Sequence, residues 1–149
     1  MIIDLLCRNE KGTLLLFIPA FFVAACNNGD KKNEVPEDDI NAARYFIKAA
    51  LEGDFDKART YIVRDSLNLQ DIDVSERLYK ERMKPEDKIK YKGALIIVHE
   101  VKRLNDSTTV VYYSNTYRNQ RDSLKVLKLE GKWLVDFKYI FKYQPDSLP

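Results

Sequence analysis

The chain has 149 residues, about the length of one domain, and a formal net charge of +2 from 25 basic and 23 acidic side chains. Lysines and acids alternate without a basic stripe, which argues against nucleic-acid binding. The chain has one histidine, and its two cysteines both precede residue 27. We therefore expect no metal site, no cofactor and no nucleic-acid partner.

The N-terminal segment has the pattern of an export signal. Twelve apolar residues, 14–25, follow Arg8 and Lys11. Such a run is shorter than the ~20 residues of a membrane-spanning helix but has the length of a signal-peptide core. It ends at residues 23–26 (VAAC), and a polar stretch follows at once. This ending resembles the lipobox of bacterial lipoproteins, in which the cysteine becomes lipidated.

The lipobox resemblance implies a signal peptide over residues 1–25, a lipid such as palmitate on Cys26, and a flexible tether over residues 26–36. It implies a lipid-anchored protein of the bacterial cell envelope. The outer membrane is favoured because Asn27, and not aspartate, follows the cysteine. The alternative is an uncleaved anchor or an ordinary secretory signal with a chance cysteine. Asp4 and Glu10 are unusual in a segment that is normally basic.

Helical periodicity follows the tether. A polar stripe runs along an otherwise apolar first helix, which must therefore be buried on most sides. Gly53 is expected to end this helix and Asp54 to cap the next one. Pro85 is expected to stop the third helix. The three helices are predicted at residues 37–52, 55–62 and 73–84, and the polar stripe comprises Asn41, Arg44, Lys48 and Glu52.

After Pro85 the period changes to two, which predicts strands. Four are expected, at residues 88–103, 107–118, 123–130 and 132–143, separated by turn-forming residues. The last should place Trp133, Val135, Phe137, Tyr139, Phe141 and Tyr143 on one face. The fold class is therefore α+β, with two to three N-terminal helices packed on a curved four-stranded antiparallel sheet. One domain should span residues 37–145, with a tail at 146–149.

Two segments carry a second resemblance. Residues 51–58 (LEGDFDKA) join two predicted helices, and residues 129–135 (LEGKWLV) close the last hairpin. Together with the order of elements they resemble the nuclear-transport-factor-2-like superfamily, and more narrowly its uncharacterised domains in bacterial lipoproteins. The resemblance implies a cone-shaped fold with a cavity at its open end. It implies no single activity.

His99 and Asp136 are the two residues with chemistry to consider. His99 should share a strand face with Tyr91, Leu95, Ile97 and Val101, where it would serve as a ligand contact or a general base. The alternative is a histidine satisfied by a tyrosine hydroxyl or by water at the edge of the core. Steroid-isomerase relatives of this fold use an aspartate base with a tyrosine. However, alternation places Asp136 opposite the aromatic face, where it should pair with Lys138 or Lys125 in solvent.

Aromatic residues are numerous for a small domain. They suit a pocket for a hydrophobic or glycan ligand, although they also suit a packed core. The candidate pocket residues are His99, Tyr45, Tyr61, Tyr113, Trp133 and Tyr139.

A short Asp-Ser motif recurs four times, with its serines at Ser66, Ser107, Ser123 and Ser147. It resembles an acceptor motif of bacterial O-glycosylation. The same dipeptide is also ordinary turn chemistry.

These observations predict a non-enzymatic binding or interaction module whose ligand is a hydrophobic small molecule, a glycan or an envelope protein. The alternative is an isomerase- or hydratase-like enzyme that uses the cone cavity. The first strand also has Ala94, Ile96 and Val98 on its second face, which suggests a homodimer through the sheet.

Overall fold

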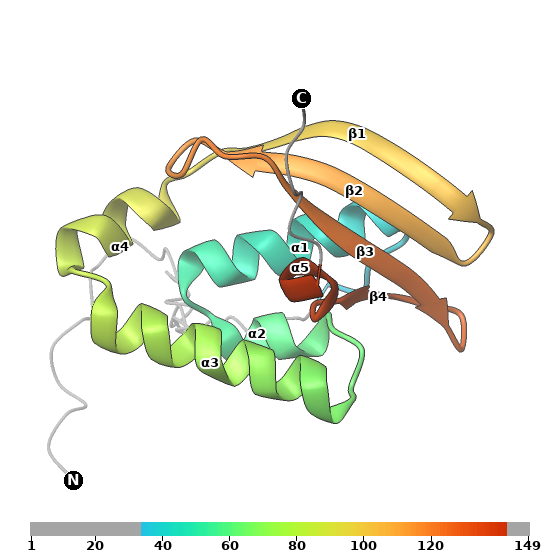
Figure 1. The fold of residues 1–149 in the computed structure, drawn as a ribbon, viewed down its shortest axis with the longest axis horizontal. Coiled ribbons are helices and arrows are strands. Elements are labelled where there is room, and N and C mark those ends of the chain that lie inside the picture. The colour runs from blue at the N-terminus through green and yellow to red at the C-terminus, as the bar shows by residue number, and fades with distance from the viewer. Residues whose placement is uncertain (1–33, 143–149) are drawn as a thin grey trace, which may run out of the picture. The chain divides into compact units, whose positions relative to one another are not determined.

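The computed structural model describes residues 34–142, all within one compact unit of the chain. Four strands form one antiparallel sheet in the order β1-β2-β3-β4 (Figure 1). The tight turn between the last two strands places Glu130 and Gly131 at positive φ, as a two-residue hairpin requires. The strands are β1 (Ile96–Asn105), β2 (Thr108–Asn115), β3 (Asp122–Leu129) and β4 (Lys132–Asp136). The α+β class and the four antiparallel strands are thus confirmed.

Five helices accompany the sheet within residues 34–142: α1 (Asp39–Glu52), α2 (Phe55–Thr60), α3 (Ser66–Arg82), α4 (Pro85–Lys92) and α5 (Tyr139–Lys142). Asp38 caps α1 by accepting a hydrogen bond from the Asn41 N–H at 2.7 Å, so this helix starts two residues later than predicted. Gly53 ends α1 with φ 74°, and Asp54 caps α2. Both predicted caps are confirmed.

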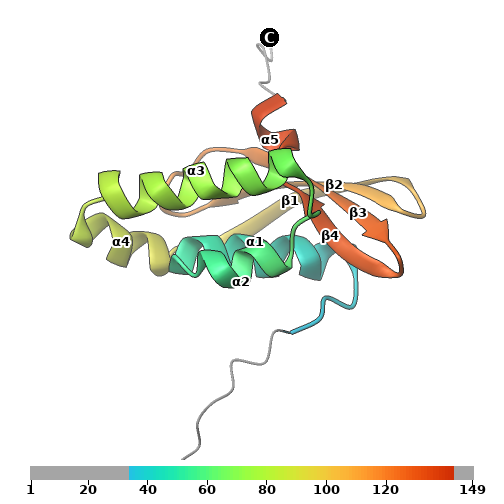
Figure 2. The same cartoon turned by 90° about the horizontal axis from the view of Figure 1, so that it is seen from below.

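Helix α1 lies under the bend of the sheet and contacts all four strands, and α3 runs beside α1 and α2 (Figures 1 and 2). The predicted polar stripe of this helix faces solvent at Arg44 and Lys48, which are exposed. The inward side of α1 meets fully buried residues from the strands. The buried residues of α1 are Asp39, Ala42, Ala43, Phe46, Ile47, Ala49 and Leu51, and those of the sheet include Val111, Leu124, Val126 and Val135.

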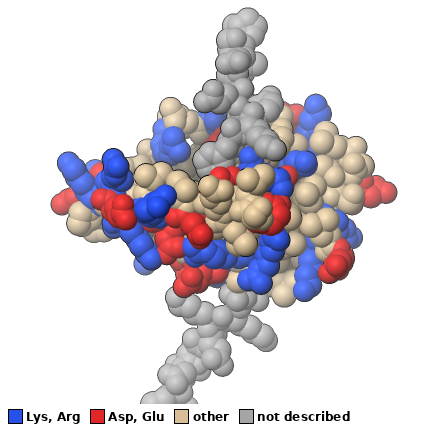
Figure 3. All heavy atoms as spheres, turned by 60° about the horizontal axis from the view of Figure 1, so that its bottom comes forward, with Lys and Arg blue, Asp and Glu red and all other residues tan. Residues whose placement is uncertain are grey.

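Ion pairs join the neighbouring helices α2 and α3. The Arg59 guanidinium lies 2.6 Å from an Asp73 carboxylate oxygen and also binds Glu76. Over the face drawn in Figure 3, basic and acidic side chains intermingle in the same way.

The predicted start of the first strand at residue 88 is wrong. Residues 85–92 form helix α4, and β1 begins only at Ile96. Pro85 begins a helix here in addition to following one. Its fixed φ suits the first helical position, where no intrahelical N–H bond is needed. Acids in the first turn (Glu86, Asp87) and lysines in the last (Lys90, Lys92) match the helix dipole.

Three further boundaries differ from prediction by three residues or more. The second strand ends at Asn115 and not at residue 118, because the Asn115 side chain accepts the N–H groups of Tyr117 and Arg118 and turns the chain there. The third helix begins at Ser66 and not at residue 73, because Asp65 caps it and accepts the Asn68 N–H at 2.9 Å. The last strand ends at Asp136. Beyond it the Lys138 N–H donates to the Asn68 side chain at 2.7 Å, so the backbone leaves the sheet and turns into α5. The predicted aromatic face therefore does not continue past β4.

A bulge in β1 changes the environment of His99. The register with β2 shifts between Val98 and Glu100, which leaves His99 as the extra residue. Val98 packs on the core, and Val101 pairs with the buried Val111, so both face the helices. His99 is exposed and does not share a face with Val101, as the unbroken alternation had predicted.

Several predictions concern residues outside the described range. These are the signal peptide at residues 1–25, Cys26, most of the 26–36 tether, and residues 143–149. Between residues 34 and 142 no helix is long and apolar enough to cross a membrane.

Candidate functional site

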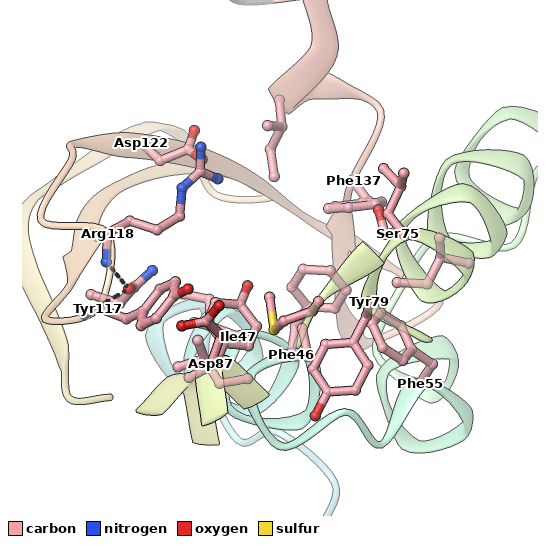
Figure 4. Close-up of a pocket in the computed structure, with 18 of the residues that line it drawn as sticks. Phe46, Ile47, Phe55, Ser75, Tyr79, Asp87, Tyr117, Arg118, Asp122 and Phe137 are labelled. Atoms are coloured by element: carbon pink, nitrogen blue, oxygen red, sulfur yellow. Dashed lines mark hydrogen bonds between the residues drawn. The ribbon is translucent and has the colours of Figure 1, made fainter. Parts of the chain in front are cut away.

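A cavity of about 550 Å³ lies between the helices and the sheet (Figure 4). Its apolar floor is a continuation of the core, because the side chains that build it also pack on one another. Phe46 of α1 and Phe137, just after β4, meet with their ring centroids 5.0 Å apart. The apolar lining residues are Phe46, Ile47, Ala50, Leu51, Phe55, Ile72, Leu78, Met83, Phe137 and Ile140.

A chain of aromatic rings forms another wall of the cavity. Tyr79 of α3 meets Phe55 at 5.5 Å and Tyr91 of α4 at 6.2 Å, measured between ring centroids. Tyr91 in turn meets Tyr117, which follows β2, edge to face at 5.3 Å. Such offset and edge-to-face contacts are the favoured geometry of aromatic pairs. The rings thereby connect α2, α3, α4 and the end of β2 around one space.

Gly53 makes this wall possible. The Tyr79 ring lies so close to Gly53 that a Cβ atom there would come within 2.6 Å of it. The same residue holds the left-handed φ of 74° that ends α1. A glycine is therefore required at this position by both the backbone and the packing of Tyr79.

The polar end of the cavity lies at the start of β3. Asp122 is the register partner of Tyr113 in β2, and both line the cavity. Burial raises the pKa of the Asp122 carboxyl, although the Ser123 N–H bond to it at 2.8 Å and the charge of Arg118 oppose that rise. Burial also raises the pKa of the Tyr113 and Tyr91 hydroxyls, so both tyrosines are uncharged at neutral pH.

Arg118 supplies the donor at this end. The Asn115 side-chain oxygen accepts the backbone N–H groups of Tyr117 and Arg118, at 3.1 and 2.9 Å, and so holds the loop after β2. The Arg118 and Asp122 side chains lie on the same side of the cavity (Figure 4). Within the described part of the chain neither forms an ion pair, with the other or with a third residue.

Of the six candidate pocket residues, Tyr113 alone lines this cavity. Tyr45 and Tyr61 pack on each other with centroids 5.8 Å apart, and the buried Tyr61 hydroxyl has no hydrogen-bond partner in the described part of the chain. Trp133 carries the Lys128 ammonium over its ring at 5.4 Å.

His99 and Tyr139 also lie outside the cavity. The exposed His99 ring has its Nε2 2.8 Å from the Ser114 hydroxyl oxygen, at the β1 bulge. The Tyr139 ring carries the Lys125 ammonium at 5.9 Å.

The Asp136 carboxylate is held by ion pairs and a hydrogen bond within the fold. Its carboxylate lies 3.3 Å from the Lys138 ammonium and 3.6 Å from that of Lys125, so both predicted pairings are confirmed. It also accepts a hydrogen bond from Asn68 at 3.3 Å. The expectation that it lies in solvent is wrong, since the residue is 6% exposed.

The serines of the Asp-Ser motif differ in accessibility. Ser66 and Ser107 are exposed, Ser123 is buried in β3, and Ser147 lies outside the described residues. Glycosylation at Ser66, Ser107 and Ser147 stays a prediction. Burial leaves Ser123 out of reach of a modifying enzyme.

Sequence reasoning missed Asp122 and Arg118 as site residues. One signal was present for the first: Asp122, Leu124 and Val126 alternate along β3, so an acid stands on the apolar, inward face. Arg118 lies in a loop, where no period reports the direction of a side chain. The Asn115 side chain three residues earlier holds the backbone of Arg118, but this local contact does not fix the direction of the Arg118 side chain.

No group of three or more histidine, cysteine, aspartate or glutamate side chains in residues 34–142 has the arrangement of a metal site. No protein-family model matches the chain, and no curated protein or solved structure matches it.

Proposed function

We propose that this domain is a non-enzymatic binding module that holds a small, largely apolar molecule in the cavity between α1, α3, α4 and the sheet. One observation carries the proposal: a space of about 550 Å³ has an extended apolar floor, and two of its charged side chains, Arg118 and Asp122, lie together on one side of it (Figure 4). Ligand sites in proteins typically combine these two features. Of the hydrophobic, glycan and protein ligands suggested by the sequence, the hydrophobic small molecule fits this lining best.

The test compares two tryptophan substitutions in α1. Ala50 lines the cavity, so Ala50→Trp adds an indole to it, whereas Arg44→Trp adds the same group at an exposed position. The environment-sensitive probe N-phenyl-1-naphthylamine should bind the wild type and Arg44→Trp equally. Ala50→Trp should weaken binding at least about tenfold by filling the space. Equal binding by all three proteins would refute the cavity as the site.

The same proposal includes the location of the domain in the cell. A lipid on Cys26 would anchor the domain to a membrane of the cell envelope, in the outer membrane by preference, and residues 26–36 would act as its tether. The support is the VAAC sequence after an apolar run. Cys26→Ser should move the protein from the membrane to the soluble fraction and remove the acyl mass from the intact protein. An unchanged distribution would contradict the anchor.

The finer fold assignment is also a proposal. Helices that lie on one side of a bent antiparallel sheet and enclose a cavity support a nuclear-transport-factor-2-like arrangement. A homodimer through the sheet has weaker support, from the exposed side chains of Leu95 and Ile97 at the start of β1. Light scattering on the purified protein should then give twice the mass of the monomer.

A second candidate function is catalysis of the isomerase or hydratase type in the same cavity. The observation in its favour is Asp122, a cavity carboxylate whose pKa burial raises, and whose register partner Tyr113 also lines the cavity. A carboxylate of this kind suits proton transfer. The candidate predicts a turnover that Asp122→Asn abolishes while His99→Ala leaves it intact, because His99 lies outside the cavity. Turnover that survives Asp122→Asn would exclude this site.

A further inference from the structure

The polar end of the cavity contains two opposite charges that are not paired with each other. Asp122 receives a hydrogen bond from the Ser123 N–H, and within residues 34–142 no side chain donates to its carboxylate. A carboxylate has about four acceptor sites, so the described residues leave most of the hydrogen-bond acceptor capacity of Asp122 unused. A ligand with an N–H or O–H group can use that capacity.

Arg118 offers the complementary group. Its guanidinium has five N–H donors, and its one side-chain partner among residues 34–142 is the Gln120 amide oxygen at a long 3.4 Å. The backbone of Arg118 is held by Asn115, so the start of the side chain is fixed. Asp122 and Arg118 face the same side of the cavity (Figure 4). A ligand oxygen can therefore accept from Arg118 while a neighbouring donor binds Asp122.

The charge of the lining argues against a charged ligand. The cavity is lined by two acids (Asp87 and Asp122) and two arginines (Arg82 and Arg118), so the formal charges of its lining sum to zero. A ligand carboxylate near Arg118 meets repulsion from Asp122, and a ligand ammonium near Asp122 meets repulsion from Arg118. A neutral group with a donor beside an acceptor satisfies both side chains without an unpaired charge.

Building on the proposed binding function, we infer that the cavity selects a neutral ligand with a flat apolar body and a polar edge that presents a hydrogen-bond donor beside an acceptor, as a primary carboxamide or a lactam does. The edge binds Asp122 and Arg118, and the apolar body lies on the aromatic wall and the floor. The edge-to-face pair of Tyr91 and Tyr117 gives that wall a flat ring next to Arg118.

The test uses four probes that share one ring system: 2-naphthamide, 2-naphthoate, 2-naphthylmethylammonium and 2-methylnaphthalene. They present a donor with an acceptor, an anionic acceptor, a cationic donor, and neither group. Calorimetric titration of the full chain carrying Cys26→Ser, which removes the lipid, gives the four affinities. The amide should bind at least about tenfold more tightly than each of the other three, the effect of one or two hydrogen bonds to charged groups.

Two substitutions with matched controls locate the polar edge. Arg118→Met and Asp122→Leu should each weaken amide binding about tenfold and leave 2-methylnaphthalene binding within about twofold. Arg121→Met, in the same loop, and Asp106→Leu, in the β1–β2 turn, remove a charge from exposed side chains that do not line the cavity. Both controls should keep the preference for the amide.

The outcomes separate this inference from the proposed function. If 2-methylnaphthalene or a charged probe binds as tightly as the amide, and Ala50→Trp blocks that binding, the cavity binds apolar ligands but the inferred edge is wrong. If no probe binds, or Ala50→Trp changes nothing, the proposed function fails and the inference with it. The order of the four probes on the unsubstituted cavity decides the matter even if a variant fails to fold.

Discussion

Helices α1 and α3 begin with the same Asp-x-x-Asn capping pattern. Only in α3 does the asparagine of this pattern also bind residues from another part of the fold. In α1 the Asn41 amide N–H₂ donates to Asp38 at 3.1 Å, and in α3 the Asn68 N–H₂ donates to Asp65 at 3.0 Å. Asn41 stays near the surface. Asn68 is fully buried, also donates to Asp136, and accepts the Lys138 backbone N–H. It thus connects the start of α3 to the end of β4.

Replacing these two asparagines by alanine should therefore have unequal effects. Asn68→Ala leaves the buried Asp136 carboxylate and the Lys138 N–H short of a partner, which should cost about 2–3 kcal/mol of unfolding free energy. Asn41→Ala removes the same local bond in an exposed setting and should cost less than about 1 kcal/mol. Urea denaturation of both variants measures the difference. Equal costs would show that the cap alone matters at both sites.

Asp39 makes stability depend on acidity. Burial raises the pKa of this carboxyl, but hydrogen bonds from Thr109 and Arg103 and the charge of Arg103 outweigh it, so the pKa falls below its usual 3.8. The ionised form is therefore the one that the fold stabilises. Its contribution is present above the ordinary pKa and is lost as the pH falls through the lowered value in the folded protein.

Asp39→Asn should accordingly reduce the unfolding free energy at pH 7 by about 1–3 kcal/mol, since Thr109 and Arg103 lose a charged acceptor. The loss should shrink as the pH falls below 3.8. Denaturant titrations at pH 7 and in that acid range check it, with Asp106→Asn, in an exposed turn, as the control. A cost that stays constant with pH would show that the charge of Asp39 is not the cause.

At the scale of elements, two glycines with the same backbone conformation should respond differently to substitution. Gly53 and Gly131 both have left-handed φ values, 74° and 78°. A methyl group at Gly53 would meet the Tyr79 ring at 2.6 Å, whereas no described residue lies within 4 Å of one at Gly131. Gly131→Ala therefore tests the backbone strain alone, and Gly53→Ala tests the strain together with the contact between α1 and α3.

We expect Gly131→Ala to cost about 1–2 kcal/mol. Gly53→Ala should cost at least about 1 kcal/mol more, since Tyr79 must move. Only Gly53→Ala should change the near-ultraviolet circular dichroism of the tyrosines and weaken binding of the naphthalene probes. Equal effects of both substitutions would show that the Tyr79 contact carries no energy.

Helix α4 shows where the periodicity of a short segment fails to predict its secondary structure. Residues 88–92 (KIKYK) alternate with the period of a strand, yet they lie in a helix in which no residue is fully buried. Periodicity reports the direction of a buried face, and α4 has too little of one for the pattern to carry information. The helix signals that decided the outcome were Pro85 at the first position and the distribution of charge toward the two ends.

At the scale of the whole molecule, burial falls from α1 toward the corner formed by α3 and α4. Helix α1 has seven buried residues, α3 has only Asn68 and Ile72, both in its first half, and α4 has none. Local opening is easiest where few side chains are buried. This corner also carries Tyr79 and Tyr91, which form part of the cavity wall.

Backbone amides of α4 should consequently exchange with deuterium at least about tenfold faster than those in the middle of α1. A bound probe should slow exchange in α4, because it adds contacts to Tyr91. Hydrogen-exchange mass spectrometry with and without 2-naphthamide measures both effects. Equal protection of α1 and α4 without ligand would contradict the gradient.

The sequence by itself determined the elements that depend on neighbours along the chain: the cap at Asp54, the glycine that ends α1, the hairpin turn at Gly131 and the presence of strands β2 and β3. Backbone sterics and short-range hydrogen bonds act over a few residues, so their signals are written locally. The tertiary structure decided the ends of β1 and β4 and the composition of the cavity. Those depend on groups far apart in the chain, such as the Asn68 side chain with the Lys138 N–H or the Tyr91 ring with the Tyr117 ring, because a cavity is defined by the surfaces that meet around it.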